Sequence, residues 1–197
     1  MSRTKAKSIK STAAKFEEYE EAAARFVPTE DYAIRPFPEG FVNFTGSVIP
    51  LLEAHSDTKV FDVTAFVSER KPDLPDAAEA NLLAHNQPSY ESAISVGGLI
   101  VYWQGQTLNK NAETSPSPAL GYDFTPDCLS FCVWKSRRQA QTAAATSAHQ
   151  AASAMALENW YQNFAVEKYA IRPDYSEETL AVDLISSRVW VRDGEVV

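Results

Sequence analysis

The chain carries three histidines, and two of them fall in segments that the sequence predicts to be helical. His85 lies in the first predicted helix of the main domain and His149 in the second, whereas His55 precedes both. Imidazole is the side chain whose ordinary pKa lies closest to neutrality, so His85 and His149 are candidate general acids or bases. For His149 the alternative is a structural hydrogen bond that fixes the second helix. Asn86 and Tyr90, close to His85 in the chain, are candidate substrate-binding residues.

The spacing of the histidines argues against a metal site. None of them stands in a His-x-x-x-His or Glu-x-x-x-His pattern, which would place two ligands on one face of a helix. The sequence also has no Gly-x-Ser-x-Gly elbow, and Gly97-Gly98 is not part of a phosphate-binding loop pattern. We therefore predict no metal and no cofactor.

Asp62 is the carboxylate most suited to a site role. Most Asp and Glu residues stand in charged, solvated runs, whereas Asp62 lies within the apolar segment from Lys59 to Val67. A buried carboxylate must be paired or hydrogen-bonded, or else its pKa rises. Asp62 is therefore a third candidate catalytic residue.

Aromatic side chains provide the candidate lining of a pocket. Small pockets for apolar ligands are usually lined by aromatic residues, with a few polar groups that set orientation. Core packing is the alternative for most of them. The candidate substrate-binding residues, in addition to Asn86 and Tyr90, are Tyr102, Trp103, Trp134, Tyr122, Phe124 and Trp160. Tyr122 and Phe124 belong to a long loop at 107–126, which we expect to fold over the pocket as a lid.

Cys128 and Cys132, the two cysteines, fall in one predicted strand. Four residues of strand separate them by about 13 Å, beyond the roughly 7 Å that a disulfide spans. No histidine or basic residue is adjacent in the sequence to lower a thiol pKa. We expect both cysteines to be reduced and buried.

The elements that must position these residues follow from the hydrophobic patterns. Strands are predicted at 59–67, 99–104, 128–134, 163–172 and 179–191, and helices at 12–26, 75–87 and 136–160. The last helix is expected to contain a break near Thr146-Ser147. Pro88 should kink or end the second of these helices, and Pro173 should end the fourth strand. Two successive β-α-β units predict an α+β fold, the ferredoxin-like split βαβ arrangement with an antiparallel sheet and both helices on one face. We divide the chain into an N-terminal extension (1–57), this domain (58–172) and a C-terminal strand and tail (173–197). The extension is expected to comprise a disordered tip, a helix and an irregular, proline-rich lead-in between residues 27 and 50.

Successive residues of a strand point to opposite faces of the sheet, and here both sets are apolar. This indicates that both faces of the sheet are covered. Leu129, Phe131 and Val133 would point to one face, and Cys132 and Trp134 to the other. The helices cover only one face, so a second sheet from a partner subunit is the simplest cover for the other. The sequence thus predicts a homodimer that forms an α/β barrel.

The run from Cys128 to Arg137, followed by Ala140, His149 and Ala152, resembles small dimeric α/β-barrel proteins akin to the antibiotic-biosynthesis monooxygenases. The shared features are a strand ending in Trp, a Ser-Arg helix start and a histidine about a dozen residues later. The segments 98–105 and 160–171 look like the second and last strands of that family. The resemblance covers residues 58–172 and implies a dimeric ferredoxin-like barrel. Relatives oxidise polycyclic aromatics without a cofactor, degrade haem or cyclise polyketides.

Composition limits the partners. A formal charge of -8 disfavours nucleic acid and anionic lipid, both of which need clustered Lys and Arg. No stretch approaches the roughly 18 apolar residues of a membrane span, and we expect a cytoplasmic protein. We predict a cofactor-independent enzyme of natural-product biosynthesis that cyclises or isomerises an apolar polyketide or terpenoid, with a Diels–Alder-type step as one candidate. The alternatives are a cofactor-free monooxygenase and a dimer that binds a small molecule without converting it.

Overall fold

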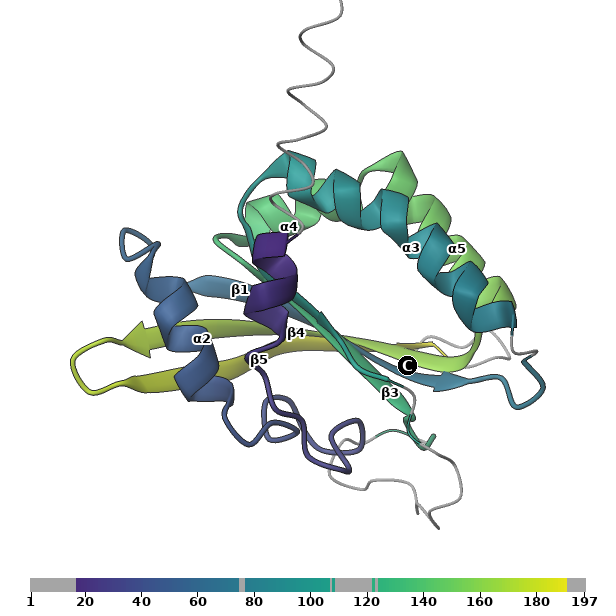
Figure 1. Ribbon diagram of the computed structural model, residues 1–197, viewed down its shortest axis with the longest axis horizontal. Helices are drawn as coiled ribbons and strands as arrows, with labels where there is room; N and C mark the ends of the chain where they lie inside the picture. Colours follow the sequence, from purple (N-terminus) through teal and green to yellow (C-terminus); the bar gives the residue numbers. More distant parts are fainter. Residues whose placement is uncertain (1–16, 75–76, 107, 109–121, 123, 191–197) are drawn as a thin grey trace, which may run out of the picture.

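The computed structural model describes residues 17–74, 77–106, 108, 122 and 124–190 (Figure 1). After a short helix at 17–23, the elements are α2 (Phe44–Glu53), β1 (Phe61–Arg70), α3 (Ala77–Val96), β2 (Leu99–Gln104), β3 (Cys128–Trp134), α4 (Arg137–Ala144), α5 (Ser147–Asn159), β4 (Tyr161–Asp174) and β5 (Thr179–Trp190). The predicted order of the strands and of the helices between them is confirmed. Helix α2 was not predicted, because the segment 27–50 was expected to be an irregular, proline-rich lead-in. Pro50 lies inside α2, and burial of Val48 and Leu52 in the core holds the helix in place.

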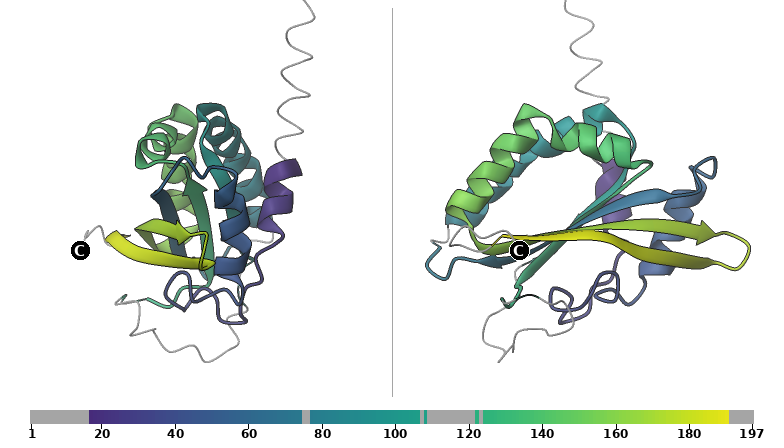
Figure 2. Two further views of the ribbon diagram at one scale, coloured as in Figure 1. Left: turned by 90° about the vertical axis from the view of Figure 1, so that its left-hand side faces the viewer. Right: turned by 180° about the vertical axis from the view of Figure 1, so that it is seen from behind.

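The sheet is antiparallel throughout, in the order β2-β3-β1-β4-β5. Helices α3, α4 and α5 lie together on one side of it, as Figures 1 and 2 show. The first four strands and these helices make the ferredoxin-like arrangement, so that prediction is confirmed. β5 extends the sheet by one strand, because it forms a hairpin with β4.

The second face of the sheet is covered by the chain itself. Phe26, Phe37 and Phe44 from the N-terminal extension pack against Phe131 of β3, with ring centroids 5.2, 5.2 and 5.7 Å apart. Helix α2 lies on this side, opposite α3 and α5 (Figure 2). We call this side the extension-covered face and the other the helix-covered face. The bare face that suggested a partner's sheet is therefore filled within one chain, and homodimer formation stays a prediction.

Register assigns the strand residues to the two faces. Val63 of β1 stands opposite Val133 of β3 and Tyr169 of β4, and all three side chains belong to the core of the extension-covered face. Cys132 and Trp134 alternate with them and pack on the helix-covered face. The strand residues are thus apolar on both faces because the N-terminal extension covers one face and the helices cover the other.

Neither Pro88 nor Pro173 ends its element. Helix α3 continues through Pro88 to Val96. The proline removes one helical hydrogen bond, but α3 packs against α5 and buries Ile94 beyond the proline, and such packing overrides local propensity. β4 continues through Pro173, which pairs with Leu180 of β5. On its other side β4 pairs with β1 only as far as Ile171, so Pro173 interrupts no ladder there.

The predicted helix at 136–160 is divided into α4 and α5. The Ser136 hydroxyl accepts a hydrogen bond from the Gln139 N–H at the start of α4, at 3.4 Å. The Thr146 hydroxyl accepts one from the His149 N–H at the start of α5, at 3.3 Å. A second N-cap inside the alanine-rich stretch lets the chain change direction. It also places His149 in the first turn of α5.

Candidate functional site

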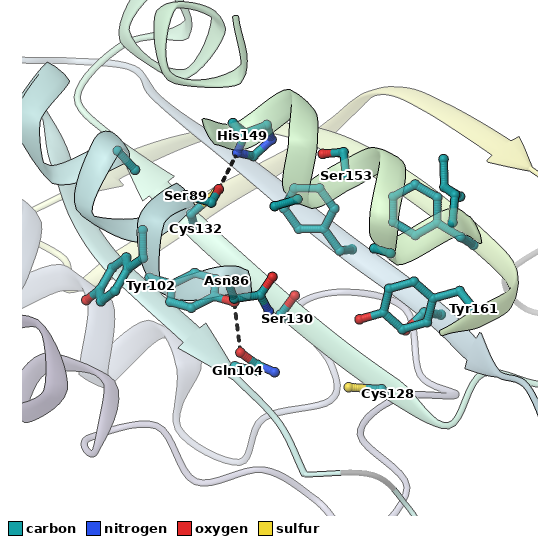
Figure 3. A pocket seen from close by; sticks show the side chains of 18 of the residues that line it. Asn86, Ser89, Tyr102, Gln104, Cys128, Ser130, Cys132, His149, Ser153 and Tyr161 are labelled. Atoms are coloured by element: carbon teal, nitrogen blue, oxygen red, sulfur yellow. Dashed lines mark hydrogen bonds between the residues drawn. The ribbon is translucent and has the colours of Figure 1, made fainter. Parts of the chain in front are cut away.

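A cavity of about 140 Å³ lies between the helices and the helix-covered face of the sheet (Figure 3). From the sheet it is lined by Phe66, Ser68, Leu99, Tyr102, Gln104, Cys128, Ser130, Cys132, Trp134, Tyr161 and Phe164. From the helices it is lined by Asn86, Ser89, Tyr90, Ala93, His149, Ala152, Ser153, Ala156 and Leu157. Leu157 is 40% exposed, so the cavity reaches the surface beside it.

The cavity exists because the helices present small side chains to the sheet. Ala93 of α3 and Ala152 and Ala156 of α5 stand where larger residues would fill the space. On the extension-covered face the corresponding volume is filled by phenylalanine rings. The helix-covered face therefore holds the hollow part of the fold.

His149 and Ser89 meet on the wall of this cavity. The Oγ of Ser89 and the Nδ1 of His149 are 3.0 Å apart, and the two residues come from different helices (Figure 3). Burial lowers the pKa of His149, and the positive charge of Lys168 lowers it further. The imidazole is therefore neutral at neutral pH and has a lone pair that can accept a proton.

Tyrosine hydroxyls supply hydrogen-bond donors elsewhere in the cavity. The Tyr102 hydroxyl donates to Oε1 of Gln104 at 3.0 Å. Tyr161 lies further along the cavity, near Cys128 (Figure 3). Burial raises the pKa of Tyr102 and of Tyr161, so both phenols stay protonated. They can orient a carbonyl or an enolate oxygen.

The cysteines line the cavity as thiols. Neither forms a disulfide, and both are buried, as predicted. Burial raises the pKa of the Cys132 thiol to about 11, and its Sγ lies 3.7 Å from the carbonyl oxygen of Thr64. A thiol that stays protonated at neutral pH is a poor nucleophile. Cys132 therefore contributes apolar surface rather than covalent chemistry.

The structure brings some of the predicted site residues together and separates others. The residues that line the cavity are His149, Asn86, Tyr90, Tyr102 and Trp134. Trp103 packs on the extension-covered face, where Phe41 lies 4.8 Å away between ring centroids. Trp160 follows α5 and packs with Leu82 of α3 in a separate small cluster. The backbone of His85 belongs to α3, but its side chain lies outside the described residues.

Tyr122 and Phe124 do not lie over this cavity. Their rings stack 5.1 Å apart in the core of the extension-covered face. The hydroxyl groups of Tyr122 and Tyr169 both donate to the buried carboxylate of Glu167, the latter at 2.5 Å. The two predicted lid residues are thus anchored on the wrong side of the sheet for a lid. Residues 107, 109–121 and 123 of the predicted lid lie outside the described residues.

Asp62 is buried beside the cavity without lining it. It faces the helices from β1, next to Trp134 in register, and is 9% exposed. Its Oδ2 is buried without a hydrogen-bond partner among the described residues. Burial raises its pKa, while the positive charges of Lys168 and Arg137 act in the opposite direction. Asp62 is thus a buried carboxylate, as the sequence predicted, and it lies adjacent to the cavity.

Several lining residues were missed, chief among them Ser89, Ser68, Gln104 and Tyr161. Residues 86, 89, 90 and 93 recur at the spacing of one helical face, so the choice of Asn86 and Tyr90 already implied Ser89. The period of two along β2 similarly links Gln104 to Tyr102. Nothing local in the sequence indicated that Ser89 would meet His149.

Within the described residues, no group of three or more His, Cys, Asp or Glu side chains could hold a metal ion. Among the described helices, none combines the length and the apolar character that crossing a lipid bilayer requires.

No protein-family model and no curated protein matches this chain. Among solved structures, one similar chain is a dimeric protein of unknown function and ferredoxin-like fold from Bacteroides fragilis NCTC 9343. It is 12% identical, with a TM-score of 0.38, and the match covers 55% of this chain and 94% of that chain.

Proposed function

We propose that this protein binds a compact, mostly apolar molecule in the cavity and isomerises or cyclises it without a cofactor, with His149 as the acid–base group. The observation that carries the proposal is a neutral imidazole on the wall of a cavity that is otherwise aromatic, aliphatic and hydroxyl-bearing. Such a lining binds an apolar skeleton and orients a single polar group.

The volume limits the substrate. An engineered protein cavity of about 150 Å³ binds benzene, and the cavity here measures about 140 Å³. One six-membered ring therefore fits inside. The remainder of a larger polyketide or terpenoid would have to extend through the opening beside Leu157.

The side chains fit a proton-transfer reaction. His149 can remove a proton next to a carbonyl group, and the hydroxyl of Tyr102 or Tyr161 can donate a hydrogen bond to the resulting enolate oxygen. Return of the proton at another carbon completes an isomerisation. General acid–base help of this kind contributes typically about 10² to 10⁴-fold in rate.

A matched pair of substitutions on α5 tests binding. Ala152 is buried in the cavity wall and Ala151 is exposed on the same helix. Ala152→Leu should abolish binding of phenol, which has one six-membered ring, measured by calorimetry, whereas Ala151→Leu should leave it unchanged. Equal affinity of the two variants would place the ligand elsewhere.

A second experiment tests the chemistry. The probe is 3-cyclohexen-1-one, whose single ring fits the cavity. Its conversion to conjugated 2-cyclohexen-1-one is a proton transfer, and the absorbance of the conjugated product reports the rate. His149→Asn should lower the rate by about 10² to 10⁴-fold. Oxygen uptake with a phenolic probe would favour the cofactor-free monooxygenase. Saturable phenol binding without conversion of any probe would favour a binding protein.

We further propose self-association through β5. This strand is an edge of the described sheet and exposes Leu184 (56%) and Ile185 (50%). Unpaired edge groups and exposed apolar side chains are typical of a strand that pairs with another chain.

A further inference from the structure

The Ser89 hydroxyl forms its hydrogen bond outside its own helix. Within a helix, Ser and Thr commonly donate to a carbonyl of their own preceding turn. Thr142 does so toward Arg138, at 2.9 Å, and Ser95 toward Ser92, at 2.7 Å. The hydrogen bond of Ser89 instead crosses to His149, sixty residues later in the chain.

The pair has the geometry of an activated nucleophile. A hydroxyl and a base within about 2.6–3.2 Å can transfer a proton as the oxygen attacks, and Oγ and Nδ1 here are 3.0 Å apart. Both side chains line the cavity, so a bound molecule lies within reach of the oxygen. The neutral state of His149 leaves it able to accept the proton.

We propose that Ser89 is a nucleophile activated by His149, and that the cavity supports acyl transfer from small, neutral esters. This goes beyond the proposed isomerisation and uses the same cavity. The substrate class follows from the lining, which is apolar and hydroxyl-bearing and contains no acidic or permanently basic side chain. An ester with one ring and no charge matches that lining and the cavity volume.

The step balances without a co-reactant other than water. The Ser89 oxygen attacks the carbonyl carbon while its proton passes to His149. The bond to the leaving alcohol then breaks, and His149 returns the proton to that alcohol. Water hydrolyses the resulting acyl-serine, again with His149 as the base. The side chain of Asn86, one turn earlier on α3, lines the same cavity and can donate its amide hydrogens to the oxyanion (Figure 3).

Phenylmethanesulfonyl fluoride is the probe for this proposal, because it carries one ring and reacts with activated serines. The bond from the Ser89 oxygen to sulfur forms, the sulfur–fluorine bond breaks, fluoride leaves and His149 takes the proton. Intact mass measurement of the full chain should show one added group, and peptide mapping should place it on Ser89. Labelling should be absent in Ser89→Ala and at least about 10²-fold slower in His149→Asn.

Ser95→Ala is the matched control, since Ser95 is exposed on the same helix and bonds within it. It should label at the wild-type rate. Labelling of the wild type at another residue, or no labelling of the wild type, overturns the proposal. This outcome does not depend on whether the variants fold. Measuring phenol binding on the same samples separates the proposed nucleophile from the proposed ligand site. Binding without labelling rejects the nucleophile alone, and loss of both rejects the cavity as a ligand site.

Discussion

Phe41 packs edge-on against Trp103, with ring centroids 4.8 Å apart at an interplanar angle of 85°. The contact joins the N-terminal extension to β2, an edge strand of the sheet. It shows that the extension belongs to the hydrophobic core of the ferredoxin-like domain.

Removing that ring should destabilise the whole domain. Phe41 is 6% exposed, and deletion of a buried phenylalanine side chain costs about 3–5 kcal/mol. Phe41→Ala should lower the free energy of unfolding by this amount in urea titrations. Its neighbour Val42 is 73% exposed, so Val42→Ala should change stability by less than about 0.5 kcal/mol. Equal, small effects would mean that the extension is not part of the cooperative core.

Acid should destabilise the protein partly through His149. Its pKa is lowered in the folded state, so below the ordinary histidine pKa of 6.5 the unfolded chain binds a proton that the folded chain resists. The stabilising contribution is present above that value and is lost as the pH falls through the folded pKa. Unfolding titrations at pH 7.5 and 5.5 should show a smaller loss for His149→Asn than for the wild type. His55, whose pKa burial also lowers, contributes to the loss that remains. Identical losses would show that His149 is not a buried neutral base.

Asp62 should show the opposite dependence on pH. Burial raises its pKa, so its charged form is less favourable in the folded than in the unfolded state. Stability therefore falls as the pH rises above the ordinary aspartate pKa of 3.8. Asp62→Asn should therefore increase the free energy of unfolding at pH 7, and this gain should shrink toward pH 4. A decrease at pH 7 would reveal a net favourable interaction with Lys168 or Arg137. It would also support the site role that the sequence suggested for Asp62.

Sedimentation tests the proposed homodimer. At micromolar concentration the wild type should sediment as a dimer, and Ile185→Lys should sediment as a monomer, because a charge on an edge strand opposes pairing. Glu177→Lys, in the exposed turn before β5, is the control and should remain dimeric. A monomeric wild type would show that the extension has replaced the partner altogether.

The sequence predicted the fold better than it predicted the cavity. Alternation along Leu129, Phe131 and Val133 is a local signal, and it identified β3 and its two covered faces correctly. The identity of the second cover was not local, because the phenylalanines of the extension follow no regular period. Tyr122 and Phe124 were placed on the wrong face for a similar reason. A hydrophobic pattern in the sequence indicates that a side chain is buried. The cavity depends instead on which small residues of two helices, distant in the sequence, face each other.

The core of the extension-covered face joins parts of the chain that are synthesised at different times. Phe44 and the phenylalanines before it leave the ribosome ahead of Phe131, against which they pack. At about 5–20 residues per second, the interval between residues 44 and 131 lasts roughly 4 to 17 s. During that time an aromatic segment has no sheet to dock on and is open to chaperones or to aggregation. We therefore expect the extension to be the last part of the domain to become native, although it is the first to be made.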